Sequence, residues 1–295
     1  MKICHSLKVL VTLILVSLML PASTLYAHGD KRPMKKGILL VGFGTTIPEA
    51  KVSFENIERS VKKAFPGVPV YWSYTSRIII KKLAKEGEKL LTPEEALASM
   101  MLEDFTHVAV QSLHTIPGEE FHGMLKNVHK FAGMSKGLKR VLVGYPLLAT
   151  SQDVQSAAET IVKVIPKERK KEDAVVLMGH GTHHPANVYY AALDYHVQKL
   201  APNIFVGTVE GWPEIDDIKA DLKKRRIKKA YLMPFMSVAG DHARNDMAGP
   251  EEDSWKSILE KEGIKCVPVL KGTAEFKEFV DIWVDHLKGA FGHFE

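Results

Sequence analysis

The chain has 295 residues, of which 25% are charged, and its net charge is +5. Because acidic and basic residues are mixed along the chain, this charge gives no indication of a nucleic-acid partner. Composition also excludes an intrachain disulfide in the mature protein. Cys4 lies in a segment that is expected to be removed, which leaves Cys266 alone.

The first 27 residues have the layout of a cleaved export signal. Lys2 and Lys8 form a basic region, an apolar run follows over residues 9–20, and the small residue Ala27 closes the segment. The apolar run is too short to favour a permanent membrane span. We therefore expect a soluble, periplasmic protein that is not embedded in the membrane and begins near His28.

Beyond this segment, apolar β-branched runs alternate with amphipathic helical stretches. Thr92 and Glu95 open one helix with the pattern of a capping box, and another helix is expected over residues 152–165. Strands that alternate with helices indicate parallel sheets covered on both faces. The expected strands span residues 38–43, 68–74, 107–113, 140–145, 174–178, 204–209, 230–235 and 265–270.

The two halves of the chain resemble each other. "GILLVGFGT" at residues 37–45 matches "AVVLMGHGT" at residues 174–182. Each segment is an apolar strand that ends in the motif Gly-X-Gly-Thr. We expect an α/β fold of two similar domains, each with a four-stranded parallel sheet flanked by helices. Such sheets bind ligands at the carboxyl ends of their strands, so a cleft between the domains would be lined by the loops that follow those strands. The expected domains are 28–168 and 169–295, and the last helix is a candidate to pack back on the first domain.

Three strands of the second half end in possible metal ligands: His180, Glu210 and, through a short loop, His242. Two imidazoles and a carboxylate suit Co²⁺, Fe²⁺ or Ni²⁺ and leave room for another ligand. The first half has Phe43 where the second has His180, so the predicted site is asymmetric. A phosphate-binding loop is disfavoured, because "GHGTHHP" lacks the third glycine of the dinucleotide fingerprint and the lysine of a P-loop. A lone histidine at a strand end can also be a structural, hydrogen-bonded residue.

The segments "GHGTHHPAN", "GTVEGWP", "LMPFMSVAGDHARNDMAG", "LLVGFGTT" and "QSLHTIPGEEF" together resemble the anaerobic-pathway sirohydrochlorin cobaltochelatases, which are class II chelatases. The resemblance covers nearly the whole mature chain and implies an exported member of that family. It also implies the family fold, which is two Rossmann-like domains with the active site in the cleft between them. It implies insertion of Co²⁺ into sirohydrochlorin, an octacarboxylate tetrapyrrole of cobalamin biosynthesis. By motif, His180 and His242 would be the catalytic pair and would share metal delivery and proton acceptance. Glu210 would complete metal binding.

The carboxylates of such a substrate need hydrogen-bond donors. Arg244, two residues from His242, is the first candidate, because a guanidinium pairs bidentately with a carboxylate. Arg77 is the second, and either arginine can instead be an ordinary surface charge. Backbone N–H groups at the end of the first strand are further candidates, in a loop that contains Gly42, Gly44 and Thr45.

Three residues of the segment "PGEEFHGM" carry further hypotheses. Glu119 and Glu120 are expected to face the cleft and to take part in proton removal or metal access, or simply to favour a helix N-terminus. His122 falls on the polar face of its helix and is expected to be solvated. The alternative is that it ligates haem at the interface of a homo-oligomer, with Met124 or a symmetry mate on the other side.

Two rival functions remain open at the level of sequence. The first is a ferrochelatase or nickel chelatase acting on the same ring, since two histidines and a glutamate accept all three ions. The second is a periplasmic metal- or haem-scavenging protein that binds without turnover. The export signal motivates this second function, because tetrapyrrole synthesis is normally cytoplasmic, whereas the presence of the family's full set of active-site residues argues against it.

Overall fold

The computed structural model describes residues 31–294. The predicted export signal, residues 1–27, lies outside the described residues. All described helices and strands belong to one compact unit, Met34–Glu295. Among the described residues, no helix is both long enough and apolar enough to cross a bilayer.

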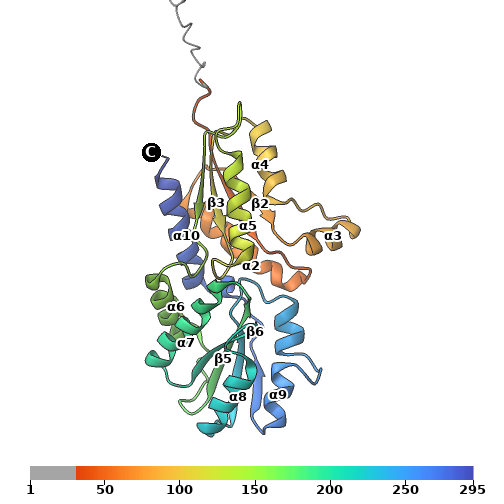
Figure 1. Cartoon of the computed structure of the whole chain (residues 1–295), viewed down its shortest axis with the longest axis vertical. Coiled ribbons are helices and arrows are strands. Elements are labelled where there is room, and N and C mark those ends of the chain that lie inside the picture. Colours follow the sequence, from red (N-terminus) through yellow and green to blue (C-terminus); the bar gives the residue numbers. More distant parts are fainter. Residues whose placement is uncertain (1–30, 295) are drawn as a thin grey trace, which may run out of the picture. The chain divides into compact units, whose positions relative to one another are not determined.

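The unit contains two parallel sheets of the same strand order, as Figure 1 shows. The first sheet has the order β2-β1-β3-β4 and the second has the order β6-β5-β7-β8. The predicted α/β fold with two four-stranded parallel sheets is thereby confirmed, and a strand occupies each of the eight expected positions. The strands are β1 (Lys36–Gly42), β2 (Val70–Tyr74), β3 (His107–Ser112), β4 (Arg140–Gly144), β5 (Ala174–Gly181), β6 (Ile204–Glu210), β7 (Lys229–Pro234) and β8 (Lys265–Pro268).

Helices connect successive strands and cover the sheets. The first half contains η1 (Pro48–Lys51), α2 (Val52–Ala64), α3 (Arg77–Lys85), α4 (Pro93–Leu102), α5 (Glu119–Val128), η2 (His129–Phe131) and α6 (Ser151–Val164). The second half contains η3 (Pro185–Asn187), α7 (Val188–Leu200), α8 (Ile215–Lys224), η4 (Ala243–Met247), α9 (Trp255–Lys261), η5 (Thr273–Glu275) and α10 (Lys277–Gly292).

The predicted capping box opens α4. The Thr92 hydroxyl accepts a hydrogen bond from the Glu95 backbone N–H at 3.3 Å, and the Glu95 carboxylate accepts one from the Thr92 backbone N–H at 2.8 Å. These bonds satisfy N–H groups that a helix start leaves without partners. Thr150 and Asp153 form the same arrangement at the start of α6. The start of each helix is therefore determined by a capping box of residues close together in the sequence.

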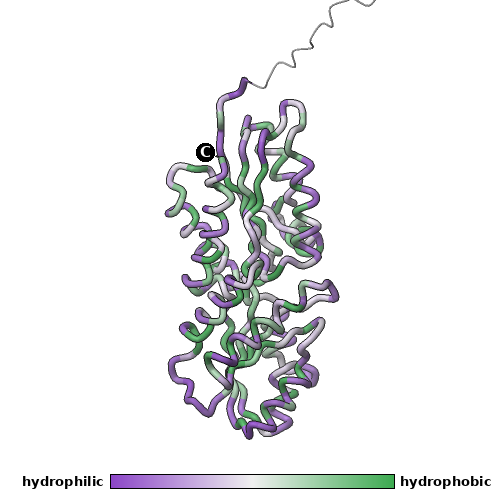
Figure 2. The backbone as a smooth tube through the Cα atoms, turned by 60° about the vertical axis from the view of Figure 1, so that its left-hand side comes forward, coloured by the Kyte–Doolittle hydropathy of each residue, from purple (hydrophilic) through white to green (hydrophobic). Residues whose placement is uncertain are grey.

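A continuous hydrophobic core runs through both halves, from Ile38 and Leu40 of β1 to Val175 and Leu177 of β5. Figure 2 shows hydrophobic stretches gathered along the strands and hydrophilic ones on the outer turns. Because both faces of a parallel sheet are covered, its strands are apolar throughout rather than alternating.

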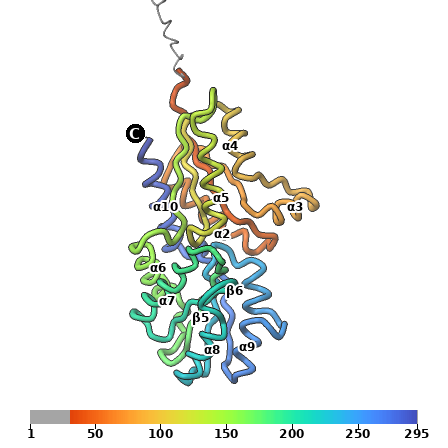
Figure 3. Tube along the Cα trace, in the orientation of Figure 1, coloured from red at the N-terminus to blue at the C-terminus, as the bar shows by residue number. Residues whose placement is uncertain are grey.

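Helix α10 returns to the first half, where it packs on β3, β4 and α2 (Figure 3). Its Trp283 is only 1% exposed and belongs to the shared core. The helix thus ties the end of the chain to its beginning and closes one face of the first sheet.

Candidate functional site

A cavity of about 580 Å³ lies where strands of both sheets end. The loop after β1, helix α3, the loop after β3 and the start of α5 contribute one part of its lining. The ends of β5 and β6 and the loop that leads from β7 into η4 contribute the other part. Parallel strands direct the residues that follow them to one edge of the sheet, and here two such edges border one cavity.

His180 and His242 face each other in this cavity, with their ring centroids 4.6 Å apart. His180 Nδ1 lies 3.0 Å from the Gly181 carbonyl oxygen, which can only accept, so Nδ1 must carry the proton. His242 Nδ1 is hydrogen-bonded to the Asp246 carboxylate, which has the same consequence. In the neutral form, both rings therefore keep the Nε2 lone pair free for a metal ion or a proton.

The two residues that flank His180 must be glycines, because neighbouring atoms leave no room for a Cβ at either position. A Cβ on Gly179 would lie 2.3 Å from Cε1 of the buried Tyr190 ring. A Cβ on Gly181 would lie 1.7 Å from the carbonyl oxygen of Glu210, and the Gly181 φ of +80° disfavours other residues as well. Backbone groups of His180 and Gly181 hydrogen-bond Tyr190, whose pKa burial raises above its ordinary value of 10.0, so the phenol stays protonated. These contacts fix the position of the His180 backbone.

Glu210 is the last residue of β6 and lines the same cavity as the two histidines. Its backbone pairs with Gly181, which holds the ends of β5 and β6 together. Within residues 31–294, no three His, Cys, Asp or Glu side chains are grouped closely enough to hold a metal ion. The structure thus brings together a facing pair of imidazoles with a carboxylate elsewhere on the cavity wall.

The first half supplies residues of several kinds to the lining. Phe43, Gly44 and Thr45 are among them, but Gly42 is not, because it packs toward the Phe54 ring. Glu119 and Glu120 line the cavity at the first turn of α5. Both carboxylates therefore occupy the helix N-terminus and the cavity wall at once, which are the two settings expected for them.

His114, after β3, is a lining residue that sequence reasoning missed. The Ser112 hydroxyl oxygen lies 2.8 Å from His114 Nδ1, and the Thr75 hydroxyl oxygen lies 3.3 Å from Nε2. Burial lowers the pKa of His114 to about 4, so the ring is neutral near neutral pH. Its position at the end of a strand, like that of His180, was the available signal.

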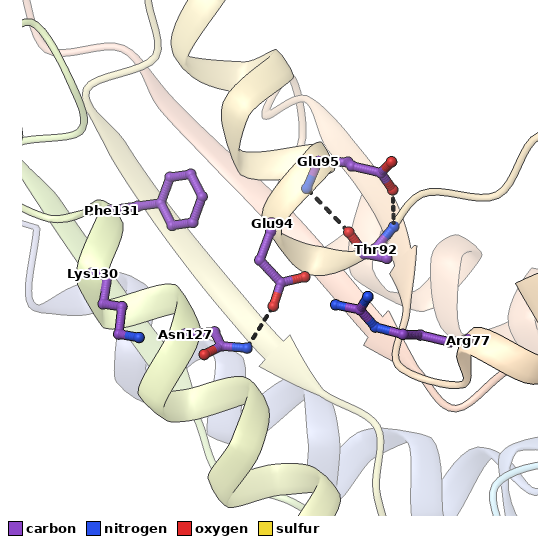
Figure 4. Close-up of a pocket in the computed structure, with 7 residues that line it drawn as sticks. All are labelled: Arg77, Thr92, Glu94, Glu95, Asn127, Lys130 and Phe131. Carbon is purple, nitrogen blue, oxygen red and sulfur yellow. Dashed lines mark hydrogen bonds between the residues drawn. The ribbon is translucent and has the colours of Figure 1, made fainter.

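Neither arginine predicted to bind substrate carboxylates lines the cavity. Arg244 Nη2 lies 3.6 Å from the Glu49 carboxylate, so this guanidinium faces a carboxylate of the protein itself. Arg77 lines a separate hollow, where Figure 4 shows it extending toward Thr92 and Glu94. Its charge contributes to the lowered pKa of Glu95, after the larger effect of the hydrogen bonds from Thr92.

The haem hypothesis receives no support from the structure. His122 is exposed as expected, and its ring lies 5.1 Å from that of His184. Met124, the predicted second ligand, is only 4% exposed and packs in the core of the first half. A residue two positions along a helix points to a different face, so Met124 cannot share an exposed ligand site with His122.

Asp246 and Lys82 were also missed from the sequence. Asp246 follows His242 by four residues, a spacing that places two side chains on one helical face and was therefore readable. Lys82 lines the cavity from α3, and no motif marks it.

Comparison with known proteins agrees with this architecture. The family model described as "Cobalt chelatase (CbiK)" matches residues 36–292. The sirohydrochlorin cobaltochelatase CbiKC of Nitratidesulfovibrio vulgaris is 44% identical over 256 residues, which is 87% of this chain and 90% of that protein. A sirohydrochlorin cobaltochelatase of Salmonella typhimurium is 34% identical over 259 residues, 87% of this chain and 97% of that protein.

Among solved structures, SirB from Bacillus subtilis with Fe³⁺ superposes with a TM-score of 0.62 at 15% identity, covering 88% of this chain and 98% of that chain. The structure of that sirohydrochlorin chelatase in complex with cobalt gives a TM-score of 0.59 at 15% identity and covers 88% and 97%. These likenesses concern the fold. The family match and the identity to two cobaltochelatases go further, and together they show that the chain belongs to the CbiK family of cobalt chelatases.

Proposed function

We propose that the protein inserts Co²⁺ into sirohydrochlorin. The observation that carries the proposal is the facing pair His180 and His242, each with Nδ1 held by an acceptor and Nε2 free in one cavity. Membership of a cobalt chelatase family supplies the reaction, and two relatives named for sirohydrochlorin supply the substrate. The product would serve cobalamin biosynthesis.

The reaction exchanges one metal ion for two pyrrole N–H protons. Co²⁺ must lose water while it keeps an open position, and imidazole nitrogen is a suitable ligand for that state. We assign metal delivery and proton acceptance jointly to His180 and His242, with Glu210 completing the transient metal site. Glu119 and Glu120 are available to receive protons or to guide the cation into the cavity, because both line it.

Substrate carboxylates are expected to meet backbone N–H groups beside Gly44 and Thr45, which line the cavity at the end of β1. Arg244 and Arg77 are not part of this proposal, since both guanidinium groups lie outside the lining and near carboxylates of the protein. Export to the periplasm and the boundary between residues 168 and 169 remain predictions.

The preference for Co²⁺ over other divalent ions can be measured. A site of histidine and glutamate also accepts Fe²⁺ and Ni²⁺, and a solved relative of this fold was obtained with Fe³⁺ and with cobalt. Competition among the three divalent ions for sirohydrochlorin, followed by the absorbance of the metallated ring, measures the preference directly.

The test of the site assignment is cobalt insertion by His180→Ala and His242→Ala. Both are expected to lose at least about 100-fold in kcat/KM, the usual range for a general acid–base group. His129→Ala, at an exposed histidine outside the cavity, is the matched control. Full activity in either cavity variant would contradict the assignment. Uptake of ring or metal at one equivalent, with no metallated product, would mean a binding protein instead.

A further inference from the structure

The charge of the cavity lining is opposite to what a polycarboxylate substrate alone would require. Four carboxylates line it, from Glu119, Glu120, Glu210 and Asp241. Against these, Lys82 is the one lysine or arginine in the lining that the described residues provide. Carboxylates in a shared cavity repel an anionic ring and attract a divalent cation. The carboxylates on the rim of the ring therefore need a cationic partner, and Lys82 is the candidate in this lining.

Lys82 is not engaged elsewhere. It is exposed, and within residues 31–294 its side chain takes part in no ion pair or hydrogen bond. Two other lysines of the first half are paired instead, Lys51 with Glu88 and Lys62 with Glu58. An ammonium group on a long flexible stem at the cavity wall is free to meet an incoming carboxylate.

Helix α3, which carries Lys82, borders the cavity and leaves most of its side chains accessible. α3 begins after Ser76, whose hydroxyl accepts a hydrogen bond from the Ile79 N–H at 3.4 Å, and it projects away from the first sheet (Figure 1). Ile79 contacts Gly44, where an added Cβ would lie 3.2 Å from Ile79 Cγ2. Leu83 is the one buried residue of α3. The helix is therefore held at Ile79 and Leu83, while Ile78 and Lys82, which are one turn apart, stay exposed.

Apolar side chains surround Lys82 on the cavity side. Ile78 and Ile79 precede it by one helical turn and line the cavity with it, and Phe43 lies in the same lining. Ile78 is 80% exposed and Phe43 is 39% exposed, which is costly for large apolar side chains unless a partner covers them. A tetrapyrrole has a flat apolar face bordered by carboxylates. Phe43 and Ile78 match the apolar face, and Lys82 matches a carboxylate.

We propose that Phe43, Ile78 and Lys82 form a substrate-positioning wall, with the two apolar side chains against the face of the macrocycle and the Lys82 ammonium on a rim carboxylate. The inference rests on the proposed function, because it takes sirohydrochlorin as the ring. It adds a specificity element from the first half that acts on the ring and not on the metal. Carboxylates elsewhere in the cavity would keep the remaining rim toward solvent.

The test separates ring binding from metal binding. Lys82→Met keeps the stem and removes the charge, Lys82→Arg restores a charge, and Lys81→Met is the control, since Lys81 is exposed on the same helix but outside the lining. For Lys82→Met, KM for sirohydrochlorin and Kd for the metal-free ring are expected to rise about fivefold, the effect of one half-exposed ion pair. KM for Co²⁺ and kcat should stay unchanged, and Lys82→Arg should recover most of the loss. Ile78→Ser should weaken ring binding without steepening its salt dependence.

Salt gives an independent readout. The ring affinity of the natural protein should fall with ionic strength more steeply than that of Lys82→Met, because screening removes the same interaction that the substitution removes. Equal ring affinity in the natural protein and Lys82→Met would overturn the inference, as would an equal loss in Lys81→Met. If the natural protein neither binds nor metallates sirohydrochlorin, the proposed function itself is wrong. That result differs from the two outcomes that would overturn only the role of Lys82.

Discussion

Replacement of Gly181 by alanine tests how the second half places His180. The added Cβ would lie 1.7 Å from the Glu210 carbonyl oxygen and 2.6 Å from its carbon, both of them backbone atoms that cannot rotate away. Gly181 also has a φ of +80°. Gly263, between α9 and β8, has a φ of +75° with no atom within 4 Å of an added Cβ. The two glycines thus share a backbone conformation and differ in their surroundings.

The expected destabilisation follows from that difference. Gly263→Ala should lower the free energy of unfolding by about 1 kcal/mol, which is the cost of a left-handed conformation for a residue with a Cβ. Gly181→Ala incurs the same cost and must also separate the ends of β5 and β6, where Gly181 pairs with Glu210. Overpacking of this kind adds about 2 kcal/mol, so a total near 3 kcal/mol is expected.

Urea unfolding of both variants measures these free energies, and cobalt insertion measures the consequence for the site. Gly181→Ala should lose most of its activity under conditions where it remains folded, because His180 and Glu210 both move. Gly263→Ala should keep the natural activity. If the two variants were equally stable, or if Gly181→Ala retained full activity, close approach of the strand ends would not be what positions His180.

Further outcomes can be measured on single variants. Asp246→Asn should lower cobalt insertion by about 10- to 100-fold, as loss of a group that orients a metal-binding histidine does, with little change in KM for sirohydrochlorin. Trp283→Ala should lower the free energy of unfolding by about 3–5 kcal/mol, because it empties a core site under α10. His114→Gln should flatten the acid side of the stability profile, measured by urea unfolding at several pH values. The folded-state pKa of His114 is lowered by burial to about 4 from an ordinary 6.5, so between these values the unfolded chain binds the extra proton. The natural protein therefore loses up to about 1.4 kcal/mol of stability per pH unit as the pH falls, and the variant should not show this part of the loss.

The strands and the two histidines that face each other in the cavity were predictable because both depend on short-range patterns. Strands of a covered parallel sheet are continuous apolar runs, and residues after such strands converge at one edge. Thr92 and Glu95 specify a helix start by bonds within four residues. The Gly-X-Gly turns are equally local, and in both halves the second glycine, Gly44 or Gly181, has a positive φ.

Helical direction explains why Arg244 and Met124 lie outside the cavity lining. Arg244 was chosen for its nearness to His242 in sequence, but two residues along a helix turn a side chain to another face, and Arg244 instead meets Glu49. The fourth residue along, Asp246, shares the face of His242. Met124 was paired with His122 by the same oversight. Spacing within a helix thus mattered more than distance in sequence.

Lys82 could not have been identified from the sequence, because its importance depends on where α3 lies. The run "RIIIKK" has the composition of a helix that buries its isoleucines, yet Ile78 is exposed at the cavity. Only the tertiary position of α3, which packs against Gly44 through Ile79, distinguishes Lys82 from Lys81.

Duplication of the fold without duplication of the chemistry explains how one cavity can handle two unlike substrates. The halves share strand order and turn geometry, but the position held by His180 in one half is held by Phe43 in the other, and both side chains line the cavity. An imidazole binds a cation through a lone pair, whereas a phenyl ring offers an apolar face to a conjugated macrocycle. If the histidines of the second half hold the metal and the α3 wall of the first half holds the ring, each partner can bind without displacing the other. The two then meet in the space between, where the ring nitrogens can exchange their protons for the ion.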